Sequence, residues 1–220
     1  MEKTLFTQLT LIKEKYERLG FTSSVVYVDV SSVLRNADKI KELASNISQI
    51  TNGEKIFNVA GKLSPKLPQA KNDETVLSAF AEYDTGRWLV TGFIEGKYNE
   101  IVYNPRSNTM KLPDYYVRWG NIIKPVETKI ISPDDIDKNK AVRRIIERIN
   151  NSAIPQLESF LTQQNFSQAI VFIWTHKPIE FHNIHYSDLK DTFQKEIKSR
   201  AFGLLILMVE YRLGLWDFEV

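Results

Sequence analysis

The sequence predicts an α+β fold with a mixed or largely antiparallel sheet and helices packed on it. Three observations carry this prediction. Apolar residues recur at helical spacing near both ends of the chain, and two β-branched runs indicate buried strands. Between them, residues 74–119 hold short apolar runs separated by turn residues, which is typical of a β-meander. Helices and strands do not alternate strictly, and this order favours α+β over a βαβ fold.

The first elements expected are a helix, a strand and a second helix. Apolar residues recur at helical spacing over 5–19, and Gly20 follows where a helix commonly ends. Residues 25–30 form a β-branched run that is too apolar for a solvated face, which predicts a central strand. Asn36 is a typical N-cap, and the apolar stripe behind it predicts a helix that stops near residues 52–53.

A short strand, an exposed loop and the meander are expected next. The strand covers 55–61. The loop, residues 62–73, holds two prolines, three lysines and few side chains that can pack. Within the meander, residues 84–86 carry a turn signal, Asp-Thr-Gly, and Gly96 marks a further turn.

The C-terminal half is expected to begin and end with helices. A helix start signal lies at 132–134, and Pro155 kinks this helix or separates it from another. The apolar run 167–176 predicts a second buried strand. A helix is expected from residue 187 toward 212, although 202–211 is apolar enough to form a strand instead.

Composition restricts the class of protein. The chain has 220 residues, 43% of them hydrophobic, which suits a single domain over 1–220 with one substantial core. Its 29 Lys+Arg nearly balance 27 Asp+Glu, so a strongly polyanion-seeking surface is excluded but a local basic patch is not. The absence of cysteine excludes disulfides, thiolate zinc sites and cysteine nucleophiles. We expect a soluble, cytoplasmic protein, because no export signal or bilayer-length apolar run is present.

One candidate catalytic site lies at the end of the predicted meander. A hairpin that turns at residues 84–87 would bring Glu74, Glu95 and Lys97 together on one sheet face. Glu74 and Glu95 would then suit a divalent cation such as Mg²⁺, and Lys97 would orient the attacking water. The Glu95-x-Lys97 step resembles the acid-x-lysine step of the PD-(D/E)xK nucleases, and this resemblance implies metal-dependent phosphodiester hydrolysis. The alternative is an exposed Glu74–Lys97 ion pair worth under about 1 kcal/mol.

A basic helix is the candidate nucleic-acid contact. Lys140, Arg143, Arg144 and Arg148 gather in the stretch "KNKAVRRIIER", where they could contact phosphates. The alternative is a solvated helix face opposite an apolar stripe.

Two further groups each have a functional and a structural interpretation. His176, His182 and His185 lie within ten residues of one another and could bind a metal, but an extended loop would separate the last two. Aromatic residues interleaved with basic ones over 80–119 could stack on nucleic-acid bases. Packing within strands explains the same aromatics.

Together these features favour a soluble intracellular binding module without chemistry of its own. Its partner would be a macromolecule, with DNA and RNA among the candidates, and it would need no cofactor. The alternative is a small Mg²⁺-dependent nuclease of the PD-(D/E)xK type that uses Glu74, Glu95 and Lys97. A third interpretation is a protein-binding module with an exposed aromatic face. No membrane partner is expected, and the oligomeric state stays open.

Overall fold

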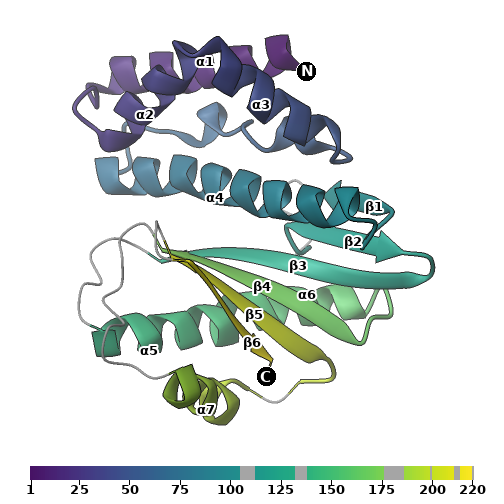
Figure 1. Ribbon diagram of the computed structural model, residues 1–220. Helices are drawn as coiled ribbons and strands as arrows, with labels where there is room; N and C mark the ends of the chain where they lie inside the picture. Colours follow the sequence, from purple (N-terminus) through teal and green to yellow (C-terminus); the bar gives the residue numbers. More distant parts are fainter. Residues whose placement is uncertain (105–111, 132–137, 176–185, 199, 211–213, 220) are drawn as a thin grey trace. The chain divides into compact units, whose positions relative to one another are not determined.

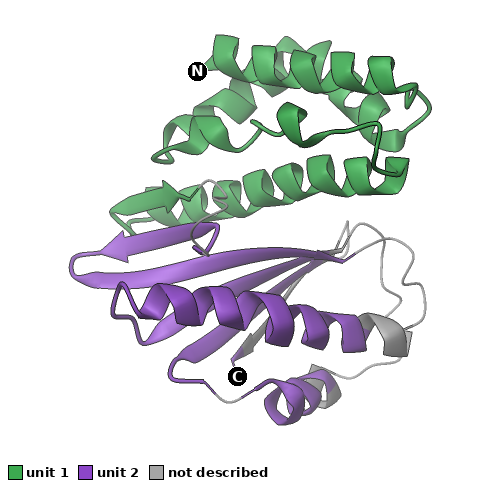
Figure 2. Ribbon diagram, turned by 180° about the vertical axis from the view of Figure 1, so that it is seen from behind, with its two compact units in different colours: residues 1–105 green, residues 106–220 purple. Residues whose placement is uncertain are grey.

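The computed structural model describes residues 1–104, 112–131, 138–175, 186–198, 200–210 and 214–219 (Figure 1). The chain divides into two compact units, Met1–Pro105 and Arg106–Val220 (Figure 2). Within the described residues, seven α-helices and a mixed sheet of five strands, β2 to β6, confirm the predicted α+β class. The expectation of a single domain over 1–220 stays a prediction, because compactness alone does not decide whether the units fold independently.

The first unit is mostly helical. It contains two short 3-10 turns and these longer elements: α1 (Glu2–Leu19), α2 (Val25–Leu34), α3 (Ala37–Ser48), α4 (Gln69–Ile94) and the strand β1 (Glu100–Tyr103). The predicted first helix is confirmed, and Gly20 ends it with φ 75°. The predicted cap of α3 is confirmed as well, since Asn36 Oδ1 accepts hydrogen bonds from the backbone N–H groups of Asp38 and Lys39, both at 3.1 Å.

The run predicted as a central strand, 25–30, is helix α2. Its N-cap is Ser24, whose Oγ accepts a hydrogen bond from the backbone N–H of Val26 at 3.1 Å. Val26 and Val30 are buried, whereas Val25 and Val28 are 74% and 57% exposed. The cap and this one-sided packing outweigh the weak preference of valine for strands.

The predicted strand over 55–61 and the predicted loop over 62–73 also differ from the structure. Residues 55–61 form turns, not a strand. The loop ends at Pro68, and α4 begins at Gln69. Asn72 is fully buried within the range predicted as exposed. Its side chain accepts a hydrogen bond from the backbone N–H of Ser64 at 2.9 Å and donates to the carbonyl of Leu67 at 3.2 Å. One buried amide therefore satisfies the backbone of a segment with few apolar side chains.

Residues 74–94 of the predicted meander belong to a single helix of 26 residues, α4. Its buried positions Val76, Ala79, Tyr83, Gly86 and Val90 recur every three or four residues, which is the period of a helix. The turn predicted from the Asp-Thr-Gly signal at 84–86 is wrong, because these residues lie inside α4, where Gly86 is on the buried side. Among the described residues of 74–119, only β1 and β2 are strands.

The second unit holds the five-stranded sheet: β2 (Tyr115–Trp119), β3 (Ile122–Ile131), β4 (Gln168–Thr175), β5 (Gly203–Glu210) and β6 (Gly214–Glu219). The spatial order follows the sequence. The β2–β3 and β5–β6 pairs are antiparallel, and β3, β4 and β5 are parallel to one another. The alternative strand expected within 202–211 is confirmed as β5, because the last predicted helix ends at Glu196.

Helices pack on one face of this sheet (Figure 1). They are α5 (Lys138–Arg148), α6 (Ile154–Leu161) and α7 (Tyr186–Glu196). The core between them and the sheet contains alternate residues of β4 and β5, together with the helix residues Ile145, Ile149, Leu157 and Phe193.

A π turn, Ile149–Ala153, joins α5 to α6 just before Pro155, as expected for a residue that lacks a backbone N–H. The start signal at 132–134 lies outside the described residues. Among the described helices, none is both long and apolar enough to cross a membrane.

Candidate active site

The predicted site residues Glu74, Glu95 and Lys97 do not come together. Glu74 lies near the start of α4 and Glu95 is its C-cap. At 1.5 Å per residue they are roughly 30 Å apart along the helix axis. Glu74 pairs with Lys71 at 2.8 Å, and Lys97 pairs with Glu95 at 2.7 Å on the surface. The hairpin that was to unite the two carboxylates is a helix, so they cannot share a cation, and the alternative pair of Glu74 with Lys97 does not form.

A different hairpin carries the same kind of arrangement. In the antiparallel β2–β3 pair, Tyr115 lies opposite Val126. One further step of this register brings Asp114 opposite Glu127, and side chains that alternate along a strand put Lys129 on the same face as Glu127. An acid on one strand therefore faces an acid-x-lysine step on its neighbour.

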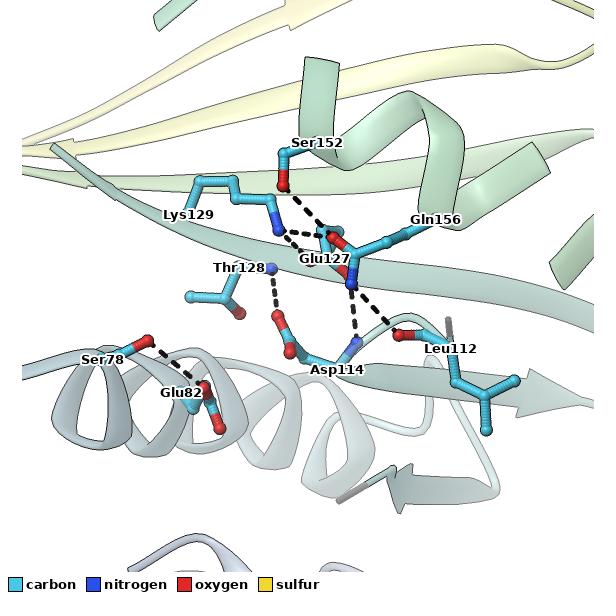
Figure 3. A network of polar contacts seen from close by, with 9 residues as sticks. All are labelled: Ser78, Glu82, Leu112, Asp114, Glu127, Thr128, Lys129, Ser152 and Gln156. Atoms are coloured by element: carbon cyan, nitrogen blue, oxygen red, sulfur yellow. Dashed lines mark hydrogen bonds and ion pairs between the residues drawn. The ribbon is translucent and has the colours of Figure 1, made fainter. Parts of the chain in front are cut away.

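Reciprocal hydrogen bonds lock the two acids to each other's strands (Figure 3). The backbone N–H of Thr128 donates to Asp114 Oδ2 at 2.8 Å. The backbone N–H of Asp114 donates to Glu127 Oε2 at 3.2 Å. Bonds from backbone donors to carboxylates are charge-assisted, and here they orient both side chains without the freedom of a flexible loop.

Gln156 of helix α6 contacts Lys129, the lysine of this cluster, which lies on β3 (Figure 3). Lys129 Nζ donates to Glu127 Oε1 and also to Gln156 Oε1, the latter at 2.8 Å. The Gln156 amide is itself held at both ends. Its Oε1 accepts from Ser152 Oγ at 3.4 Å, and its Nε2 donates to the backbone carbonyl of Leu112 at 3.4 Å. The ammonium group is thus directed by one carboxylate and one amide, and Gln156 also contacts the segment that leads to Asp114.

The cluster is buried. Asp114, Glu127 and Lys129 are only 1%, 0% and 9% exposed. Side chains of these types are almost never fully buried unless they are paired or coordinate a metal. Their burial on a rigid hairpin distinguishes them from the surface pair Glu95–Lys97, whose side chains are 50% and 66% exposed.

The donor set fits a hard divalent cation. Asp114 and Glu127 contribute carboxylate oxygens, which Mg²⁺ and Mn²⁺ prefer. Within the part of the chain that the structure describes, no group of three His, Cys, Asp or Glu side chains is arranged to hold a metal. The site would therefore be a two-carboxylate one. Mg²⁺ accepts such sites readily, because it keeps several waters and takes further oxygens from substrate phosphates.

Sequence reasoning missed this cluster although a signal was present. The stretch from Pro113-Asp114 to Glu127-Thr128-Lys129 contains an acid and, after a hairpin turn, an acid-x-lysine step inside a β-branched run. Charged residues inside so apolar a strand indicate buried, partnered groups. The predicted meander ends at residue 119, before β3, and therefore leaves Asp114 without the strand it pairs with.

The other predicted groups stand as follows. Arg143, Arg144 and Arg148 are exposed on α5. This placement suits both a phosphate contact and a solvated face. Lys140 belongs to the same helix, but its side chain lies outside the described residues, as do His176, His182 and His185. The predicted aromatic platform is divided: Tyr83, Tyr103 and Tyr115 are buried, and the other aromatic residues keep part of their surface accessible. Of its tryptophans, Trp88 and Trp119 keep 44% and 63% of their surface exposed.

Comparison of the chain with protein-family models, with curated proteins and with solved structures found no match.

Proposed function

We propose that this protein is a divalent-metal-dependent nuclease of the PD-(D/E)xK type, with Asp114 and Glu127 as metal ligands and Lys129 as the lysine of the motif. One observation carries the proposal, namely the buried and hydrogen-bonded cluster of these three side chains on adjacent strands. The order Pro113-Asp114, then Glu127-Thr128-Lys129, also follows the letters of that pattern. The reaction is the one predicted for Glu74, Glu95 and Lys97. The residues proposed to carry it out are Asp114, Glu127 and Lys129.

Each side chain has a defined task in this mechanism. Asp114 and Glu127 would hold Mg²⁺, which when bound polarises a phosphoryl oxygen and makes bound water a better nucleophile. Lys129 would orient the attacking water and offset negative charge that develops on the phosphate. Gln156 is a positioning residue, since its contact with Lys129 Nζ at 2.8 Å fixes the direction of the ammonium group.

A purely structural role explains the cluster less well. A buried ion pair adds little net stability, because the cost of removing both charges from water offsets their attraction. Apolar side chains on these strands would fill the same space without that cost. Two buried acids and one buried lysine are therefore better explained by chemistry that needs them, such as the binding of a cation and a phosphate.

The test is a cleavage assay with plasmid and with single-stranded DNA in Mg²⁺ or Mn²⁺. The wild-type protein is expected to cleave, and EDTA to stop it. Lys129→Ala should reduce the rate by roughly 10²-fold or more, as the loss of a catalytic group does. Lys97→Ala is the matched control, because Lys97 also lies two residues after a glutamate but on the surface.

Two outcomes would reject the proposal. Metal-dependent cleavage that survives unchanged in Lys129→Ala would assign the activity to another site or to a contaminant. Salt-sensitive nucleic-acid binding by a folded wild-type protein that never cleaves would support the binding module without chemistry.

A further inference from the structure

The tip of the β2–β3 hairpin combines an exposed aromatic ring with positive charge. Trp119 and Ile122 face each other across the turn, and they are 63% and 53% exposed. Lys124 follows Ile122 by two residues and so lies on the same face of β3. The cross-strand diagonal from Trp119 to Lys124 spans roughly 7–8 Å between backbones. The stretch 115–126 contains two basic residues and no acidic one.

The hairpin presents this tip rigidly. Gly120 and Asn121 form a two-residue turn, and Gly120 has φ 57°, a conformation that favours glycine. Strand β3 pairs with β4 only from Val126 onward, so the residues from Trp119 to Lys124 stand clear of β4. An indole that is exposed on a short, tight turn loses little conformational freedom when a ligand stacks on it.

We propose that Trp119 stacks on an unpaired base of a single-stranded DNA or RNA substrate while Lys124 contacts its phosphate backbone. This inference rests on the proposed nuclease function and specifies its substrate class. A flat aromatic ring beside a lysine is the combination that binds single strands, because every base offers a face for stacking and every nucleotide a phosphate. A duplex keeps its bases stacked on one another and offers Trp119 no such face.

Strand alternation places the tip on the other side of the sheet from the candidate active site. Trp119 and Lys124 lie on the face of the β2–β3 pair opposite that of Asp114, Glu127 and Lys129. Asp114 and Trp119 are also separated by the length of β2, about 17 Å at 3.4 Å per residue. A stacked strand rises 3.4 Å per nucleotide, so Trp119 contacts substrate at least about five nucleotides from the cleaved bond, where the strand has passed around the hairpin.

The experiment measures binding without cleavage, by fluorescence anisotropy of labelled oligonucleotides in EDTA. The probes are a 12-nucleotide DNA strand, the RNA strand of the same sequence and the corresponding DNA duplex. Trp119→Ala is expected to weaken binding of a single strand roughly tenfold. Trp119→Phe should restore most of it, because a phenyl ring also stacks. Trp88→Ala is the matched control, since it removes another exposed tryptophan far along the sequence.

Comparing the affinities for the DNA strand and the RNA strand shows which of the two nucleic acids the protein binds. The inference is overturned if wild-type protein binds neither strand, if Trp119→Ala binds both as tightly as wild type, or if Trp88→Ala weakens binding equally. It is also overturned if Trp119→Ala weakens duplex and single-strand binding to the same extent. Failure of the nuclease proposal looks different: Trp119-dependent binding would persist with no cleavage in Mg²⁺ or Mn²⁺.

Discussion

Replacement of Lys129 by methionine tests the geometry of the buried cluster through stability. Methionine has a similar length and no charge, so the variant leaves Glu127, which is 0% exposed, without the ammonium group. Removing one partner of a buried pair costs about 3–5 kcal/mol, because the remaining charge stays desolvated. For a chain of this length, each kcal/mol lowers Tm by about 2–4 °C. Lys129→Met should therefore lower Tm by roughly 6–20 °C.

The assay is urea unfolding monitored by circular dichroism, which gives the free energy of unfolding. Thermal melts give Tm as a second measure. Lys97→Met serves as the control, because its partner Glu95 is exposed and such pairs contribute under about 1 kcal/mol. The double variant Glu127→Gln/Lys129→Met should recover most of the loss, since it removes both charges together. If Lys129→Met costs no more than Lys97→Met, the ammonium group is not paired in a buried site and our account of the cluster is wrong.

Two further predictions concern the first unit. Asn72→Ala should destabilise the protein by about 1–3 kcal/mol in urea unfolding, because it leaves the part-buried backbone N–H of Ser64 without its acceptor; a loss under about 1 kcal/mol would contradict this role. Burial, followed by the hydrogen bond to Asp73, raises the pKa of Tyr16 above that of an unfolded tyrosine. The stability that Tyr16 contributes should be complete below about pH 10 and fall as the pH rises further, because the unfolded chain then loses its proton first. Tyr16→Phe should flatten this alkaline decrease, and an unchanged pH profile would contradict the assignment.

The fold was predictable from sequence where local signals and tertiary packing agree. Asn36 caps α3 and Gly20 ends α1 as expected, because these residues act within one helical turn. The prediction failed where packing decides between two local preferences. The valine run of α2 suits a strand by propensity, but the Ser24 cap and one-sided burial select a helix. In α4, Gly86 suggested a turn, yet it is buried within a long helix.

The candidate site was predictable in type but not in position. Asp114, Glu127 and Lys129 have the expected arrangement, in which an acid faces an acid-x-lysine step across two antiparallel strands. The sequence predicts this arrangement for Glu74, Glu95 and Lys97 instead, because short acid-x-lysine steps are common in a charged chain and carry no sign of burial. The contribution of Gln156 could not be predicted, since it depends on how α6 packs on the sheet.

The central claim is that Asp114 and Glu127 form a divalent cation site. The most direct test is to titrate the metal-free protein with Mn²⁺ and to measure the heat of binding by isothermal titration calorimetry. We expect saturable binding by the wild-type protein and by Glu74→Gln, and a loss of at least tenfold in affinity for Asp114→Asn. Equal Mn²⁺ affinity for wild type and Asp114→Asn, with both folded, would contradict the claim.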